Sequence, residues 1–415
     1  MTYNIALVSD FFLPNLGGVE VHILNLAKSL IKRGNKVIVI THSQHRDSKI
    51  KFVEGVKVYY LPISILIGNC SWPSFFSNFF QLKKVFNQEN IQIIHGHQSM
   101  SPLAYEALLL GQLFNLKTVF TDHSLFVSNN LENIIVNRLS KFVLGNVNRI
   151  ICVSYELKDN LLERIEINHE KIHVIPNGVS NEFKYYKKEK GKFIKVVICC
   201  RLVYRKGVDL LLKAIPLICK SNKKIQIILV GDGPKKDEID QMVDDTNCNI
   251  KLIKNLSQKK LNTLFNKCDI FLNTSLTESF CIANLEAACC GLKVVCTNVG
   301  GVKEVLPPSM IKLVKPHYKS IAEGVKKMIK EKRISKKHAK KIKKNYSWKK
   351  ISKDTELIYK NISDESVMFN QLFYNTGEEE RWLFRMILLI MLIFKYFWIK
   401  CFEKRVKKIN ELKYV

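Results

Sequence analysis

The sequence lacks several patterns that would assign it to a common class. None of its 12 cysteines falls in a C-x-x-C pair, so neither a zinc ribbon nor a redox motif is indicated. The adjacent pairs Cys199-Cys200 and Cys289-Cys290 lie in apolar runs, which favours buried, reduced thiols of a cytosolic compartment. The segment 3–8 has the pattern of a buried first strand, so we expect no signal peptide.

Acidic residues are scarce relative to basic ones. Against 66 Lys and Arg there are 37 Asp and Glu, which gives the 415 residues a net charge of +29. Much of the excess lies in a helix-like run between 315 and 344. Such a run suits an anionic membrane surface as well as nucleic acid, and a solvated surface helix is an equally good explanation. No nucleic-acid motif accompanies it, so we expect no binding of nucleic acid.

Apolar runs alternate with helical segments along the chain, which is typical of an α/β protein with parallel sheets. In the first half, strands are expected at 3–8, 36–41, 56–61, 91–95, 117–121, 149–153 and 172–175, and helices most clearly at 19–33 and 102–113. The second half starts again, with strands expected at 193–200, 225–230, 250–253, 269–273 and 293–296.

A turn signal at Pro176-Asn177-Gly178 and a lysine-rich stretch to Gly191 mark the boundary between two domains, 1–180 and 190–345. Each domain is expected to be a doubly wound, Rossmann-like unit. Ligands of such sheets bind beyond the carboxyl ends of the strands, so the two domains should face each other across a cleft.

The C-terminal part adds a helix and an apolar segment. A helix is expected at 346–359, with Trp348, Ile351 and Leu357 on its apolar positions. Residues 382–399 are apolar but contain Arg385 and Lys395, and a basic tail, 400–415, follows. The segment is borderline for a membrane span. The basic tail should stay in the cytosol, as should the two domains, but a single membrane span would place them on opposite sides. An anchor that lies in the membrane plane or re-enters it is therefore also possible.

Two glutamates flank the start of an apolar helix that is expected from about Cys281 to Cys290 and ends at Gly291. Glu278 belongs to the loop before this helix and Glu286 to its second turn. Between them lie the free N–H groups of the first turn, a natural anion site. This arrangement suits a sugar nucleotide, with acids for the sugar and ribose hydroxyls and amides for the diphosphate. Solvated helix charges are the alternative interpretation.

Glycine turns follow two other expected strands. Gly17 and Gly18 precede a helix, where the backbone can approach a phosphate closely. This pair is not the G-x-G-x-x-G fingerprint, which weakens a dehydrogenase interpretation. Gly231 follows a strand of the second half, where a flat base could lie against the backbone. Both could also be ordinary tight turns.

Charged and titratable residues occupy further strand ends. Arg201 and Lys206 follow the first strand of the second half, where two cations could neutralise a diphosphate without a metal, although a surface cluster is possible. His123 follows an N-terminal strand at the same rim and is as easily functional as structural. His95 and His97, at the end of the preceding strand, are more economically structural.

Together, these stretches resemble glycosyltransferase family 4, whose two-domain fold is called GT-B. Within it, the chain is similar to the catalytic subunits of phosphatidylinositol N-acetylglucosaminyltransferase. The similarity extends from residue 5 to about 310, and the segments that carry it are VSDFFLPNLGGVE, VFTDHSLF, IICVSY, VIPNGV, RLVYRKGVDLL, GDGPK and FLNTSLTESFCIANLEAACCGLKVV.

The resemblance implies transfer of GlcNAc from UDP-GlcNAc to phosphatidylinositol with retention of configuration, the first step of glycosylphosphatidylinositol (GPI) anchor synthesis. It implies partner subunits and a place at the endoplasmic reticulum membrane, with the catalytic domains facing the cytosol. No cofactor and no metal are expected, since no D-x-D motif is evident. The last helix, 346–363, is expected to return to the N-terminal domain.

The resemblance also implies roles for individual residues. His123 would lie beside the reacting centre, and Gly17 and Gly18 would close on the donor. The remaining residues would bind the donor: Arg201 and Lys206 its diphosphate, Glu286 its ribose, and Glu278 with the amides of Phe280, Cys281 and Ile282 its sugar and phosphates.

Three other interpretations stay open. The chain could be another family 4 transferase, for example a lipid mannosyltransferase, or a GT-B epimerase that needs no lipid. A basic scaffold or nucleic-acid-binding protein that has kept an inactive fold is a third, but the presence of Arg201, Lys206, Glu278 and Glu286 argues against it.

Overall fold

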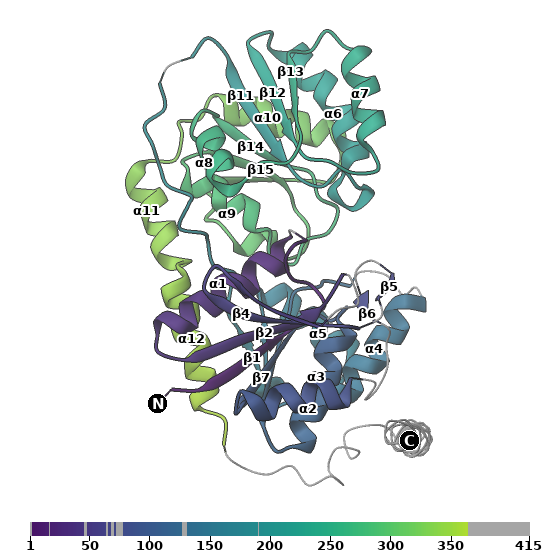
Figure 1. The fold of residues 1–415 in the computed structure, drawn as a ribbon. Coiled ribbons are helices and arrows are strands. Elements are labelled where there is room, and N and C mark those ends of the chain that lie inside the picture. The colour runs from purple at the N-terminus through teal and green to yellow at the C-terminus, as the bar shows by residue number, and fades with distance from the viewer. Residues whose placement is uncertain are drawn as a thin grey trace, which may run out of the picture.

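The computed structural model describes residues 2–15, 17–44, 48–63, 65–67, 70–71, 78–126, 131–189 and 191–363. Two α/β domains lie one above the other, and a pair of C-terminal helices runs along their common edge (Figure 1). The predicted arrangement of two parallel-sheet domains is confirmed. The apolar segment 382–399 lies outside the described residues. None of the helices within the described ranges is long and apolar enough to cross a membrane.

The first domain is built on an eight-stranded sheet with the order β10-β9-β8-β7-β1-β2-β4-β3. Neighbouring strands are parallel except β3, which pairs with β4 in a hairpin. The strands are β1 (Asn4–Val8), β2 (Lys36–His42), β3 (Lys49–Val53), β4 (Val56–Leu61), β7 (Ile93–His97), β8 (Lys117–Asp122), β9 (Arg149–Cys152) and β10 (Ile172–Val174). A separate ribbon joins β5 (Ile65–Ile67) to β6 (Cys70–Ser71). The helices are α1 (Gly18–Lys32), α2 (Phe79–Gln88), α3 (Pro102–Leu113), α4 (Leu131–Leu144) and α5 (Tyr155–Arg164), and a 3₁₀ turn, η1, spans His169–Lys171.

The second domain has a six-stranded sheet with the order β13-β12-β11-β14-β15-β16, in which neighbouring strands are parallel. The strands are β11 (Ile194–Cys199), β12 (Ile225–Val230), β13 (Ile250–Ile253), β14 (Ile270–Asn273), β15 (Lys293–Thr297) and β16 (Ile311–Val314). The helices are α6 (Val208–Ser221), α7 (Lys236–Asp244), α8 (Gln258–Asn266), α9 (Ile282–Cys289) and α10 (Tyr318–Ile329), with 3₁₀ turns η2 (Tyr204–Lys206) and η3 (Gly300–Glu304).

The ribbon of β5 and β6 is not expected from the sequence, and three strands of the two main sheets also differ from the expectation. The apolar pattern does not predict β3 or β16, because β3 is largely exposed and β16 is a four-residue strand with only its two ends buried. β7 begins two residues later than predicted, because Ile93 is the residue in register with Ile5 of β1. His95 therefore lies inside the strand and His97 at its end.

The chain returns to the first domain through α11 (Lys336–Asn345) and α12 (Trp348–Lys360), and α12 packs on α1. The Ser29 hydroxyl donates to the carbonyl of Trp348 at 3.0 Å, and Arg33 pairs with Glu356 at 2.5 Å. The prediction that Leu357 faces the apolar side is wrong, because its side chain is 47% exposed. Tyr359 is buried there instead.

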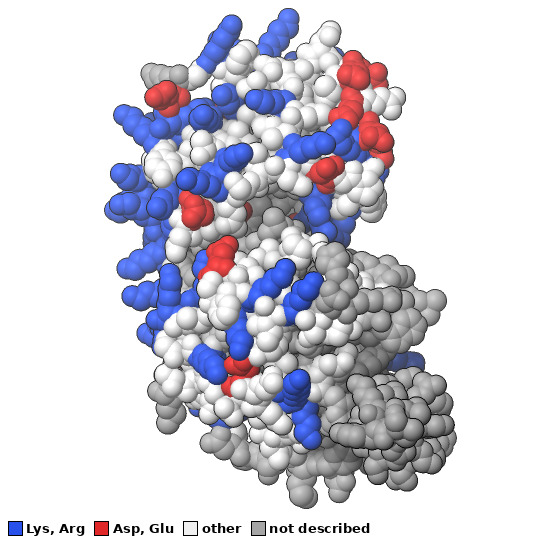
Figure 2. Space-filling view, in the orientation of Figure 1, with Lys and Arg blue, Asp and Glu red and all other residues white. Residues whose placement is uncertain are grey.

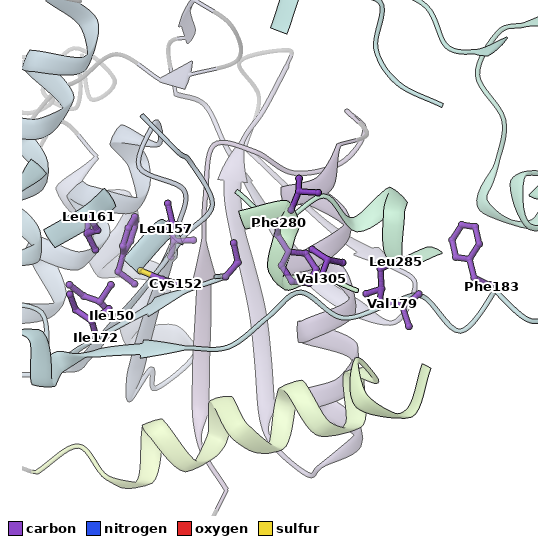
Figure 3. Packing of buried hydrophobic residues seen from close by; sticks show 14 of the residues in the cluster. Ile150, Cys152, Leu157, Leu161, Ile172, Val179, Phe183, Phe280, Leu285 and Val305 are labelled. Atoms are coloured by element: carbon purple, nitrogen blue, oxygen red, sulfur yellow. The ribbon is translucent and has the colours of Figure 1, made fainter. Parts of the chain in front are cut away.

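The two domains share buried apolar packing. One cluster joins Ile150 and Leu157 of the first domain to Phe280, Leu285 and Val305 of the second (Figure 3). A polar contact lies beside it. The Glu304 carboxylate accepts the N–H groups of Tyr155 and Glu156 at 2.7 and 2.8 Å, in the first turn of α5. A carboxylate at a helix N-terminus is favourable, so this contact helps to hold the domains together.

Candidate functional site

A cavity of about 1570 Å³ lies between the two domains. Loops that follow the carboxyl ends of strands in both sheets line it, together with the start of α1, α9 and the beginning of α12. All the sequence-predicted site residues line this cavity except Phe280. The Phe280 side chain is buried and packs near the Tyr346 ring, so only its backbone could take part in binding.

Lys206 and Glu278 form an ion pair in the wall of the second domain. The Lys206 Nζ lies 2.5 Å from Glu278 Oε1, and the Ser275 hydroxyl donates to the same oxygen at 2.8 Å. Burial opposes the charge of Lys206, but the Glu278 carboxylate outweighs it and raises the lysine pKa. Lys206 is thereby held cationic in a fixed position. The two residues, which the sequence suggests for separate tasks, are in direct contact.

The turn after Lys206 requires glycine. Gly207 has a φ of 70°, and a Cβ there would come within 1.9 Å of the carbonyl oxygen of Thr274. The Thr274 hydroxyl also donates to the Lys206 carbonyl at 3.0 Å. The loop after β11 is therefore fastened to the end of β14, which neighbours β11 in the sheet. This contact brings Lys206 next to the segment that carries Glu278.

Two exposed arginines, Arg201 and Arg205, also line the cavity on this side. Opposite them, Glu20 lies in the first turn of α1. Burial raises its pKa, while the charge of Arg201 lowers it. A Cβ on Gly17 would be 2.5 Å from Glu20 Oε2, so Gly17 leaves room for this carboxylate. The α1 terminus predicted to receive phosphate thus has a carboxylate beside it. Neither Glu20 nor Arg205 is among the residues predicted from the sequence.

The first turn of α9 has an unusual entry. The helix begins at Ile282, one residue later than predicted, and Cys281 before it has φ 66° and ψ 81°. A non-glycine residue is rarely found in this region, and such strained residues often lie at functional sites. The Asn273 amide contacts Cys281 Sγ at 2.8 Å. The Ile282 side chain reaches across the cavity toward Gly18, where a Cβ would be 3.8 Å away.

Glu286 lies on the next turn of α9 and lines the cavity. Burial raises the pKa of its carboxyl group to about 8. No ion pair or hydrogen bond from the described residues satisfies this carboxyl group. At neutral pH it is therefore mostly protonated, and ligand hydroxyls would be natural partners for it.

On the side of the first domain, three histidines form a buried cluster that we call the histidine floor, and His123 is the member that lines the cavity. His123, just after β8, contacts His97 at the end of β7, with 3.4 Å between Nε2 and Nδ1. His22 of α1 lies edge-on to His123, with ring centroids 4.7 Å apart. Burial lowers the pKa of His22 to about 4 and the pKa values of His97 and His123 well below their usual range. The rings are therefore neutral.

The structure includes His97 in this floor, although the sequence favours a purely structural role for that residue. It also adds His22. The sequence feature that could have identified His22 is its position one turn after Gly18, on a helix whose N-terminus faces the cavity. The Ser279 hydroxyl donates to the His123 carbonyl at 2.7 Å, which joins this floor to the opposite domain. Gly231 lines the cavity at the end of β12, where a Cβ would be 1.9 Å from the Cys200 carbonyl oxygen.

Comparison with known families accounts for this architecture. Residues 16–183 match the model described as Glycosyltransferase Family 4, and residues 180–348 match the model described as Glycosyl transferases group 1. The fold is similar to sucrose-phosphate synthase from Thermosynechococcus elongatus, with a TM-score of 0.72 and 18% identity over 86% of this chain and 98% of that one. At this identity the likeness concerns the fold, and it confirms the GT-B-like architecture.

Relatives with much higher identity define the family more narrowly. The chain is 37% identical to a phosphatidylinositol N-acetylglucosaminyltransferase subunit of Homo sapiens, over 95% of this chain and 85% of the relative. It is 35% identical to the phosphatidylinositol N-acetylglucosaminyltransferase gpi3 subunit of Schizosaccharomyces pombe, over 94% of this chain and 90% of that relative. The chain therefore belongs to glycosyltransferase family 4, and within it to the family of these phosphatidylinositol N-acetylglucosaminyltransferase subunits.

Proposed function

We propose that this chain transfers N-acetylglucosamine from UDP-GlcNAc to phosphatidylinositol with retention of configuration, the first step of GPI anchor synthesis. The observation that carries the proposal is the 37% identity over 95% of the chain to a human protein named as a subunit of phosphatidylinositol N-acetylglucosaminyltransferase. The cavity supports it, because residues suited to a nucleotide diphosphate and to hydroxyl groups line opposite sides of one interdomain space.

The donor diphosphate is assigned to the side of the second domain. As the bond between the sugar C1 and the phosphate oxygen breaks, negative charge develops on the departing UDP. Arg201, Arg205 and Lys206 are positioned around the cavity to stabilise this charge, and the free N–H groups at the start of α9 add to it. Glu286 would accept the ribose hydroxyls, and Glu278 would contact the sugar while holding Lys206.

The acceptor is assigned to the side of the first domain. An inositol hydroxyl oxygen forms the new bond to C1 on the face that UDP leaves, and its proton passes to the departing phosphate oxygen. The products are N-acetylglucosaminyl-phosphatidylinositol and UDP. His123 lies beside this centre and, because it is neutral, can donate or accept a hydrogen bond without adding charge.

The location and partners form part of the same proposal. We place the chain at the endoplasmic reticulum membrane with its domains in the cytosol. The described cysteines are all unpaired, as expected in a reducing compartment. The names of the human and yeast relatives describe subunits, and we propose that this chain also works with further subunits.

A basic ridge supports contact with an anionic membrane surface. Lysines and arginines gather along the edge of the molecule where α11 runs (Figure 2). This helix contributes six lysines and no acidic residue, and buries only Ala339 and Ile342. Each lysine near an anionic leaflet contributes about 1 kcal/mol of attraction, so a ridge of this kind suits a lipid acceptor presented at such a surface.

The transfer can be tested in membranes that contain the chain and its co-expressed partner subunits. Radiolabelled UDP-GlcNAc and phosphatidylinositol should give N-acetylglucosaminyl-phosphatidylinositol, and Lys206→Ala or Glu286→Ala should abolish it. Lys213→Ala, at an exposed position of α6, is the matched control and should leave the yield unchanged. Transfer from GDP-mannose in place of UDP-GlcNAc would contradict the donor assignment, and full activity of both site variants would contradict the site.

A further inference from the structure

We propose that His22, His97 and His123 form a binding site for a divalent transition-metal ion of the Zn²⁺ type. One ring nitrogen from each histidine lies within 4.8 Å of the others. The three residues come from α1, the end of β7 and the residue after β8, so parallel strands and a packed helix fix their relative positions. This site does not depend on which sugar or lipid the chain uses.

The spacing of the histidines fits coordination better than it fits hydrogen bonding. The distance of 3.4 Å between His97 Nδ1 and His123 Nε2 exceeds the usual range for an N–H donor. Tetrahedral zinc holds imidazole nitrogens at about 2.0–2.1 Å, which places two such nitrogens roughly 3.3 Å apart. A small rotation of the three rings toward a common point would therefore complete the ligand set.

His97 supplies a second, independent observation. Its ring is fully buried, and its Nε2 has no hydrogen-bond partner among the described residues. A neutral imidazole carries one N–H and one lone pair, so with Nε2 unpaired only the long contact at Nδ1 remains. A buried polar ring with so few contacts commonly indicates an unseen ion or water. A cation between the rings would replace the long contact at Nδ1, and Nε2 would keep the proton of His97.

His22 is oriented as metal-binding histidines are. Its Nδ1 lies 2.7 Å from the Asn177 side-chain oxygen, which can only accept. The proton must therefore be on Nδ1, which leaves the lone pair on Nε2 for a ligand. An outer partner that fixes the tautomer in this way is typical of histidine metal sites. The Trp348 ring packs edge-on against His22, 5.1 Å away, and limits its movement.

The chemistry of the ligands selects the ion. Three neutral imidazoles favour Zn²⁺, Co²⁺, Ni²⁺ or Cu²⁺ over Mg²⁺ or Ca²⁺, which prefer oxygen. Because His123 lines the cavity, a fourth coordination position would face it and take water or a hydroxyl oxygen. The ion would lie on the floor of the first domain, whereas Lys206 belongs to the opposite wall.

The test is a titration of the tag-free full-length chain with Co²⁺. We expect one saturable site with the visible ligand-field bands of tetrahedral Co²⁺ and without a thiolate charge-transfer band. His22→Gln and His97→Gln should each weaken binding at least about 10-fold, and Asn177→Ala about 10-fold through the loss of its support. His169→Gln, at an exposed position of η1, is the control and should bind as the wild type does.

Several outcomes would overturn the proposal: no saturable binding to the wild-type chain, a thiolate charge-transfer band, or equal binding by the histidine variants. If circular dichroism shows that those variants misfold, the Cu²⁺-loaded wild type decides. Its electron paramagnetic resonance spectrum should show coupling to three imidazole nitrogens, and coupling to one or none would refute the site.

Discussion

Glu286 should make donor binding depend on pH in a direction that follows from its burial. Its pKa is raised to about 8, so at pH 7 roughly one molecule in ten carries the ionised carboxylate. A carboxylate that accepts both ribose hydroxyls must be ionised, so binding should release a proton. The affinity for UDP should therefore rise about 5-fold between pH 7 and 8 and about 10-fold in all before it levels off above the pKa, as the ionised fraction of Glu286 does.

Isothermal titration calorimetry with UDP at pH 6.5 to 9, in two buffers of different ionisation enthalpy, measures this proton release directly. The comparison is with Glu286→Gln, which keeps the shape of the side chain but cannot titrate. Because the phosphate of UDP titrates equally in both experiments, its contribution cancels in the difference. At pH 7 the wild type should release close to one proton more than the variant. Equal proton release, or an equal slope of affinity against pH, would refute the reasoning.

The same pKa fixes the sign of a stability effect. Folding raises the pKa of the Glu286 carboxyl group from 4.5 to about 8, so between these pH values the folded state binds more protons than the unfolded state. Its contribution to the free energy of unfolding is therefore fully present below pH 4.5 and is lost as the pH rises toward 8. The loss should be on the order of a few kcal/mol. Urea unfolding at pH 5 and pH 8 should show a smaller decrease for Glu286→Gln than for the wild type.

Three further predictions concern the walls and the outer surface. Lys206→Ala should lower kcat/KM for transfer by about 10²–10³ through loss of charge stabilisation, and steady-state kinetics with unchanged activity would contradict this role. Glu304→Ala should lower the free energy of unfolding by about 1 kcal/mol, because two N–H groups of α5 lose their acceptor, and should enlarge the radius of gyration in small-angle scattering. Charge reversal at Lys337 and Lys341 should weaken sedimentation with anionic vesicles but not with neutral ones; equal sedimentation of variant and wild type would exclude the ridge as a membrane contact.

The sequence predicts the strands well where they are apolar and central. β1, β11 and β12 lie within one residue of their expected ranges, because buried parallel strands leave continuous apolar runs. The exposed β3 and the four-residue β16 have no such run, and they escape prediction for that reason. Amphipathic spacing likewise misplaces Leu357, since the face of α12 that is buried depends on how it lies against α1.

The residues predicted for the site line one cavity except Phe280, but their contacts could not be predicted. Ligands of parallel sheets bind at strand ends, and this rule selects Arg201, Lys206 and His123 from the sequence. The pairing of Lys206 with Glu278 depends on β11 and β14 being neighbours in the sheet, although 72 positions separate the two residues in the chain. No local pattern contains that information. The orientation of His22 by Asn177 depends in the same way on the packing of α1 against the link between the domains.

The division of charge in the cavity follows from this packing. Burial keeps His22, His97 and His123 of the histidine floor neutral, whereas Lys206 stays cationic because Glu278 accompanies it into the wall. A bound diphosphate would therefore be attracted to the second domain and would gain no comparable charge from the histidine floor. Of this floor, His123 reaches the cavity, and its ring nitrogens suit an uncharged hydroxyl or a transition-metal cation. Because the Ser279 hydroxyl bonds to the His123 carbonyl, movement of either domain would change both surfaces together.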